Sequence, residues 1–110
     1  NYENGKKQIR GIFSINNIGN HREMFVVDII GDYKLIDGLL KEIKKVSKEF
    51  DVSIIYILSN PYIENSQMFK NGYIKLKNKN LVCLPLNLQI EEKLLNYNNW
   101  EMFGGLHDAL

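Results

Sequence analysis

The chain has very little of several residues on which specialised proteins depend. It contains a single cysteine, Cys83, so neither an internal disulfide nor a cysteine-rich zinc site can form, which suits a reducing compartment. No apolar run approaches the ~20 residues that a membrane-spanning helix needs. No basic stretch followed by an apolar one opens the chain, as it would in an export signal. We therefore expect a cytoplasmic protein without a membrane partner.

Arginine is scarce as well, and the charges nearly cancel. Only Arg10 and Arg22 are present, among 14 lysines and arginines in total, and the formal net charge is +1. Arginine is the usual side chain for bidentate contacts with phosphate and guanine, and a nearly neutral chain exerts no long-range attraction on nucleic acid. Nucleic acid is therefore not an expected partner.

Residues for a metal centre or a nucleophilic triad are equally rare. His21 and His107 are the only histidines, one in a predicted hairpin and the other near the C-terminus. Neither has cysteine or carboxylate neighbours at ligand spacing, so we expect both to be exposed to solvent. Cys83 lies within an apolar run, which favours an inert thiol in the core. The residues alone thus predict no metal site and identify no catalytic side chain.

What the chain does have is the composition of an ordinary globular domain. Its 110 residues are 45% hydrophobic and 25% charged, which fits one domain over residues 1–110 or half of a larger one. Residues 1–8 are expected to form a polar arm. In the stretch Gln8–Ile15 apolar side chains alternate as in a strand, and Gly11 fits either a bulge or close packing.

A strand, a helix and a second strand follow, and they form the clearest pattern in the sequence. The run Met24–Ile30 is apolar on both faces except at Asp28, as in a strand buried within a sheet. Asp32 is placed to cap a helix in which apolar residues recur at intervals of three and four. These residues are Leu35, Ile36, Leu39, Leu40, Ile43, Val46 and Phe50. The run Val52–Asn60 is again typical of a buried strand, which Pro61 ends.

Shorter elements follow the second strand. The stretch Asn65–Lys70 predicts a short amphipathic helix, Gly72 a left-handed cap, and Tyr73–Lys77 an edge strand. The run Leu81–Leu86 is typical of another strand, with Pro85 near an edge or a bulge.

The predicted fold class is α/β (α+β mixed), in the order strand–helix–strand–helix–strand–strand. A strand–helix–strand crossover of this length makes its two strands parallel. The sheet is therefore expected to be mixed, with a central parallel pair and antiparallel final strands. Residues 87–110 are expected to form a C-terminal tail with one helical turn.

Two polar residues lie at the end of the predicted parallel pair. A carboxylate such as Asp28 is costly inside a buried run unless it is paired or reaches the end of the strand. It either sits at the rim and bonds nearby backbone, or it lies beside a ligand cleft. Sheets of this class bind ligands at the C-terminal ends of parallel strands, and Asn60 ends the neighbouring strand at that edge. The cleft that the sequence predicts is there.

This arrangement resembles the C-terminal half of the GNAT N-acetyltransferase superfamily, of the bacterial type. The resemblance rests on the run "MFVVDII", the long helix after it, the run "VSIIYILSN" and the corner "NSQMFKNGY". Gly72-Tyr73 matches the family's x-Gly-Phe/Tyr, and the resemblance extends over about residues 9–86. In that family the two parallel strands splay apart, and the pantetheine arm of acetyl-CoA lies between them, paired with exposed backbone groups.

The resemblance implies transfer of an acetyl group from acetyl-CoA to an amine acceptor, with a sugar amine as one candidate. The backbone of the first strand would face the thioester and the arm, while the short helix would line the channel. The residues implied in binding acetyl-CoA are Val27, Asp28, Ile29, Gly31, Asn60, Ser66 and Phe69.

The chain also departs from the family pattern. The family holds pyrophosphate with a basic, glycine-rich loop, whereas the segment here is Gly31–Lys34, in which Asp32 would cap the helix and repel a phosphate. Met68 stands where a proton-donating tyrosine is frequent. Two alternatives to an enzyme therefore stay open: a degenerate, non-catalytic GNAT-like module for binding or dimerisation, and an orphan α/β domain. A half-domain would leave a sheet edge unpaired, so we expect a homodimer that closes it.

Overall fold

Alternating and continuous apolar runs fold into seven strands and two helices in the computed structural model, which describes residues 1–76, 79–87 and 100–101. In chain order the elements are β1 (Tyr2–Asn4), β2 (Lys7–Ile18), β3 (His21–Gly31), the 3-10 turn η1 (Tyr33–Leu35), α1 (Ile36–Glu49), β4 (Ile54–Leu58), α2 (Asn65–Lys70), β5 (Ile74–Leu76), β6 (Leu81–Pro85) and β7 (Trp100–Glu101).

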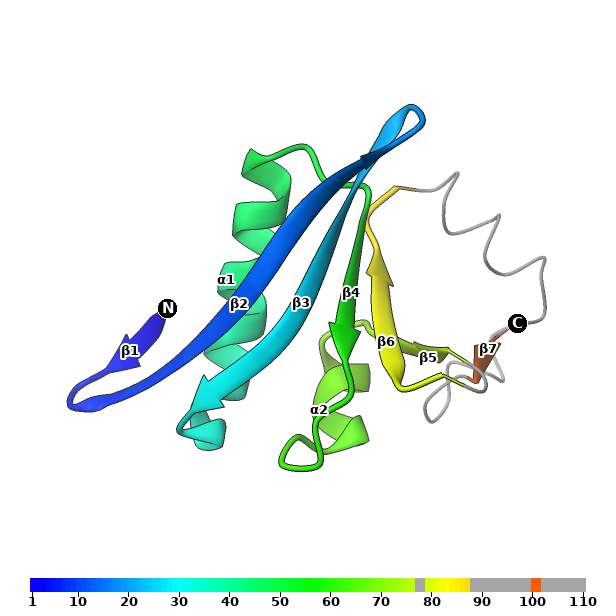
Figure 1. The fold of residues 1–110 in the computed structure, drawn as a ribbon. Coiled ribbons are helices and arrows are strands. Elements are labelled where there is room, and N and C mark those ends of the chain that lie inside the picture. The colour runs from blue at the N-terminus through cyan, green and yellow to red at the C-terminus, as the bar shows by residue number, and fades with distance from the viewer. Residues whose placement is uncertain (77–78, 88–99, 102–110) are drawn as a thin grey trace.

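The strands form one sheet in the order β1-β2-β3-β4-β6-β5-β7 (Figure 1). Strands β3 and β4 run parallel, joined by the crossover through α1, and the other paired strands are antiparallel. The predicted α/β class, with a mixed sheet and a central parallel pair, is therefore confirmed. The two long strands β2 and β3 make a hairpin that extends well beyond their shorter neighbours (Figure 1).

Helix α1 covers one face of the sheet, behind β2 and β3 in Figure 1. Its apolar stripe packs on the side chains of the strands that point the same way, as the three- and four-residue spacing predicts. Each fully buried aliphatic side chain contributes about 1.5–3 kcal/mol to this core. The principal contributors are Ile9, Met24, Val26, Ile29, Ile36, Leu39, Leu40 and Ile43. Within the described parts of the chain, neither helix is long and apolar enough to cross a bilayer.

The C-terminal half of α1 differs from its prediction at two positions. Phe50 is 47% exposed, because the helix ends at Glu49 and Phe50 is its C-terminal cap rather than part of the stripe. Ser47 is fully buried instead. Its hydroxyl donates to the Ile43 carbonyl at 2.7 Å and lies 3.4 Å from the Met24 sulfur, so a polar residue is satisfied inside the core.

Residues 1–8 do not form the expected polar arm. Tyr2–Asn4 is a strand that pairs with the start of β2. The Tyr2 ring packs over Gly38 of α1, where an added Cβ would lie 2.3 Å from ring atoms. The polar composition of the segment hid this contact, because it joins residues that are far apart in the sequence.

The first long strand keeps its regularity at Gly11. An added Cβ there would make ordinary contacts, 3.6 Å from Val26 and 3.7 Å from Ile43, so Gly11 marks close packing of α1 on the sheet. Of the two interpretations of this glycine, close packing fits. The bulge lies on the partner strand, β3.

Helix α2 and the corner after it have the predicted form. The Glu64 amide donates to Gln67 Oε1 at 3.3 Å, which begins the helix with a capping interaction. At the other end the Gly72 amide donates to the Phe69 carbonyl and the Tyr73 amide to the Met68 carbonyl, a Schellman motif. Gly72 has a φ of +90°, which a glycine adopts without strain.

The final strands differ from the prediction in position. Tyr73–Lys77 was expected at the edge, but β5 lies between β6 and β7. Strand β6 lies between β4 and β5, and it tolerates Pro85 because this residue is its last. Except for Trp100–Glu101 in β7, the predicted tail after residue 87 lies outside the described residues.

Gly31 ends β3 in a conformation that only glycine tolerates. Its φ is +138°, and an added Cβ would lie 2.4 Å from the Gln8 carbonyl oxygen of β2. The next amide, that of Asp32, donates to the same oxygen at 2.9 Å. Strand β2 therefore holds the chain tightly at the point where it turns toward α1.

We predict that Gly31→Ala lowers the free energy of unfolding by more than about 3 kcal/mol, because the cost of the strained backbone is added to the cost of the clash with the β2 main chain. Urea denaturation measures it. The matched control is Gly19→Ala, where φ is +57° but no atom lies within 4 Å of the added Cβ. That variant should lose only about 1–2 kcal/mol. Equal losses in the two variants would contradict the close approach of β2.

Candidate functional site

A bulge in β3 separates the parallel strands. Ile12 lies opposite Asp28 and Phe13 opposite Val26, so Val27 has no partner on β2. Such an extra residue bends its strand and increases the local twist. The pairing of β3 with β4 stops at the same level, with Val26 opposite Ile57 as its last pair. Beyond it the two strands diverge toward their C-terminal ends (Figure 1).

The divergence leaves a groove of ≈ 250 Å³. On one side it is lined by Val27, Asp28 and Ile29 of β3, and on the other by the segment 58–62, which ends β4 and leads away from it. Tyr33 of η1 completes the lining. The sequence therefore placed the cleft at the correct edge, and four of the seven residues implied in binding acetyl-CoA line it.

One backbone carbonyl is the focus of polar contacts in the groove. The Tyr33 hydroxyl donates to the Ile29 oxygen at 2.8 Å. Asn60 Nδ2 lies 3.5 Å from that oxygen and 3.5 Å from the Tyr33 hydroxyl. Asn60 is itself fixed, because its Oδ1 accepts the Tyr62 amide at 2.8 Å. Three segments thus converge on the Ile29 carbonyl.

Two tyrosines that were not among the predicted site residues line the groove. The rings of Tyr33 and Tyr62 stack with their centroids 5.3 Å apart and an interplanar angle of 21°. Tyr33 comes from η1, before α1, and Tyr62 from the segment after β4. The sequence signal for both is their place: each lies within two residues of a polar residue that follows one of the parallel strands, Asp32 after β3 and Asn60 after β4. Only the fold brings the two rings together.

Asp28 is an exposed residue that lines the groove. Among the described residues its carboxylate makes no hydrogen bond or ion pair, so it does not bond nearby backbone. Of the two interpretations of this residue, the position beside a cleft therefore fits the structure. Among the described residues it is also the only one of formal charge that lines the groove, which gives the cavity a negative character.

The segment Gly31–Lys34 is arranged as the helix cap that the sequence predicts. Asp32 Oδ1 accepts the Lys34 amide at 3.0 Å, and the Asp32 carbonyl accepts the Leu35 amide at 3.0 Å. The Lys7 Nζ lies 3.9 Å from Asp32 Oδ2. A carboxylate therefore occupies the first turn, where a phosphate would otherwise accept hydrogen bonds.

The remaining implied residues do not face the groove. Gly31 and the two residues of α2, Ser66 and Phe69, are not among its lining residues. Ser66 is exposed, and its hydroxyl donates to Glu64 Oε2 at 3.3 Å. The reason is the orientation of α2, which presents Met68 rather than Ser66 toward the end of β4.

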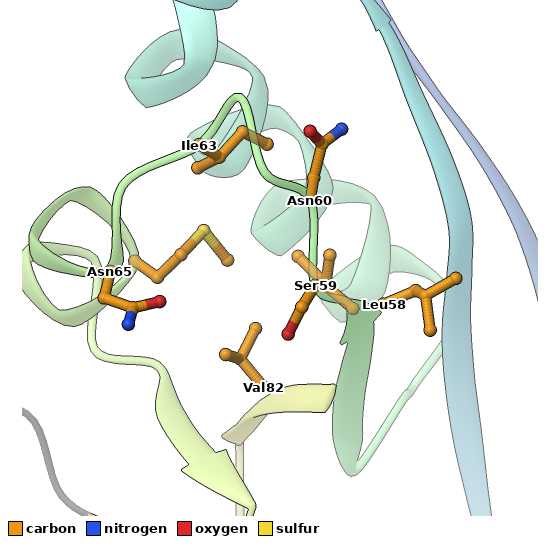
Figure 2. Close-up of a pocket in the computed structure, with 8 residues that line it drawn as sticks. Leu58, Ser59, Asn60, Ile63, Asn65 and Val82 are labelled. Atoms are coloured by element: carbon orange, nitrogen blue, oxygen red, sulfur yellow. The ribbon is translucent and has the colours of Figure 1, made fainter. Parts of the chain in front are cut away.

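Met68 lines a second, smaller cavity of ≈ 30 Å³ between the end of β4, α2 and β6. Figure 2 shows Ile63, Asn65 and Val82 around it, with the Asn60 side chain turned away from Val82. This volume is large enough to hold a water molecule. The segment 58–60 lines both cavities, so it forms the wall between them.

The other titratable candidates are structural. His21 was expected in solvent, but it is only partly exposed, and its Nε2 lies 3.1 Å from Glu23 Oε2, because residues i and i+2 of a strand share a face. His107 lies outside the described residues. Cys83 is fully buried in β6, and burial raises the pKa of its thiol to about 12. No group of three metal-binding side chains occurs in the described part of the chain.

Comparison with protein-family models, with curated protein sequences and with solved structures gave no significant match. The assignment of the site therefore rests on the geometry of β3, β4 and η1.

We predict that Cys83 resists alkylation by iodoacetamide at neutral pH while the protein is folded. Its thiolate is the reactive species, and burial both raises the pKa to about 12 and shields the sulfur. Mass spectrometry should find one adduct only after unfolding in urea. Rapid labelling of the native protein would contradict the burial of β6.

Proposed function

We propose that the chain is the C-terminal part of a GNAT-like N-acyltransferase, which transfers an acetyl group from acetyl-CoA to an amine acceptor. The observation that carries the proposal is the groove between the diverging parallel strands β3 and β4. A slot of this kind, open at the C-terminal ends of two parallel strands, is what the resemblance requires.

The groove suits a thin arm that carries amides. Beyond Val26 the backbone of β3 is paired only with β2, so the groups that point toward β4 have no strand partner there. The pantetheine arm of acetyl-CoA has two secondary amides and can add to such a strand as an extra strand does. Val27, Asp28 and Ile29 would supply these backbone contacts, with Asn60 on the opposite wall.

The side chains at the groove suit an amine acceptor. In the proposed reaction the neutral amine attacks the thioester carbonyl, a C–N bond forms, the C–S bond breaks, and the nitrogen proton leaves. A backbone amide near the Val27 bulge would stabilise the negative charge on the carbonyl oxygen. Asp28 lines the groove next to Val27. Its carboxylate is available to bind the acceptor while the amine is an ammonium, or to accept the proton that the nitrogen loses. The thiolate would take its proton from solvent, since Met68 replaces the tyrosine.

The end of the groove near α1 does not suit a pyrophosphate. Asp32 occupies the first turn, and none of the described residues that line the groove is a lysine or an arginine. We therefore derive no step through the phosphates, and we expect the arm to supply most of the affinity.

We predict that acetyl-CoA binds the chain in calorimetry and that Leu58→Trp weakens binding by at least about tenfold. Leu58 is 45% exposed and lines the groove, so a larger ring would fill part of it. The control is Ile18→Trp, at an equally exposed apolar residue near the turn between β2 and β3. It should bind as the unmodified chain does. Absence of binding, or equal affinities for the two variants, would contradict the proposal.

A second candidate is the non-catalytic module, and one observation favours it. Strand β1 pairs only with residues 7–9 of β2. On the side of β2 that faces away from β3, residues 10–18 therefore have no strand partner in the described part of the chain. Ile12, Phe13 and Ile18 on this stretch are exposed. A long edge with apolar side chains is a template for pairing with a second copy. The second candidate is therefore a homodimer that joins the two β2 edges.

We predict for this candidate that light scattering detects a dimer and that Ile12→Lys weakens it, because a lysine on an edge strand opposes pairing. Ile30→Lys is the matched control, since Ile30 is equally exposed but lies on the inner strand β3. It should leave the dimer intact. A strict monomer at high concentration would rule the dimer out.

A further inference from the structure

Tyr33 occupies a hydrogen-bonding position that a ligand in the groove would need. The Ile29 carbonyl lies beyond the last β3–β4 pair, so no strand donor reaches it from β4. Its oxygen accepts the Tyr33 hydroxyl at 2.8 Å, while the Asn60 amide is more distant at 3.5 Å. The phenol is thus the principal donor to this carbonyl.

The stacking of Tyr33 on Tyr62 holds the phenol in this position. The two rings, 5.3 Å apart, link η1 to the segment after β4, and hence the two walls of the groove. Asp32 fixes the turn that carries Tyr33, since its carboxylate accepts the Lys34 amide. The Tyr33 side chain is therefore held by the stacked Tyr62 ring, and its backbone is held by the turn at Asp32.

A ligand that pairs with the Ile29 carbonyl has to displace the phenol. If the ligand brings an N–H donor, one hydrogen bond replaces another and the exchange is nearly balanced. If it brings only apolar groups, a carbonyl inside the groove loses its donor, which disfavours binding. The Tyr33 hydroxyl therefore lowers the affinity of every ligand and penalises those without an amide most.

We infer that Tyr33 is a specificity-determining residue of the groove: its hydroxyl keeps the Ile29 carbonyl occupied and yields it only to a ligand with a secondary amide N–H. This inference rests on the proposed function, because the ligand of that chemistry is the pantetheine arm. It adds a role for a residue that the resemblance to the acyltransferase family does not supply.

The test compares Tyr33→Phe with the unmodified chain in calorimetry, because phenylalanine keeps the stacked ring and removes only the hydroxyl. The probes are pantetheine and an analogue methylated on both amide nitrogens, which has no N–H donor. The matched control is Tyr2→Phe, in which the same atom is removed from a ring that packs on α1 and has no recorded hydrogen bond in the described chain.

The expected result is that Tyr33→Phe binds both probes more tightly, by about three- to tenfold, with the larger gain for the methylated analogue, so that the preference for an N–H donor falls, and that Tyr2→Phe is unchanged. Binding of pantetheine by Tyr33→Phe alone would overturn the inference, because the hydroxyl would then not yield to an amide ligand. Equal binding of pantetheine by the two proteins would overturn the inference and leave the proposed function standing. Absence of binding in every protein would overturn both.

Discussion

The extra residue at Val27 is the feature on which the rest of the site depends. Strand β3 is paired with β2 on one side from His21 to Gly31 except at Val27, and with β4 on the other side only as far as Val26. Strand β4 itself ends at Leu58, one residue after its last pair with β3. Because the bulge bends β3 at the level where the parallel pairing stops, the sheet opens at its centre rather than at an edge, and the opening exposes backbone groups. The proposed binding of an amide-bearing arm uses those groups.

The surrounding chain satisfies much of what the bulge exposes. Tyr33 and Asn60 approach the Ile29 carbonyl, and Asp32 accepts an amide of the first turn that could otherwise serve an anion. The groove is therefore polar but largely self-satisfied, and Asp28 is the one carboxylate among the described residues that line it. A site of this kind favours a neutral or cationic group over an anionic one. This balance explains why the proposal places the affinity in the arm and not in the phosphates.

Much of the fold follows from local patterns, and most of the site does not. Helix α1, the buried strands and the Gly72 corner depend on spacing, capping and glycine conformation, which lie within a few residues of one another. The cleft was also placed correctly, because the ends of parallel strands meet at one edge. The bulge at Val27, the packing of Tyr2 on Gly38 and the Tyr33–Tyr62 stack depend on pairs that are distant in the sequence. No local pattern distinguishes these residues from their neighbours. The direction in which α2 presents Ser66, away from the groove, also depends on packing between distant segments and was not predictable from the helix sequence.

Amide hydrogen exchange along β3 shows whether the parallel pair is open beyond Val26. We expect that amides of residues 27–29 that point away from β2 exchange quickly in the free protein, while Met24 and Val26 within the parallel pair stay protected. Saturating acetyl-CoA should then slow exchange at residues 27–29. Uniform protection from Met24 to Ile30 without ligand would mean that the strands remain joined. No change at residues 27–29 with ligand would mean that the groove does not hold the arm.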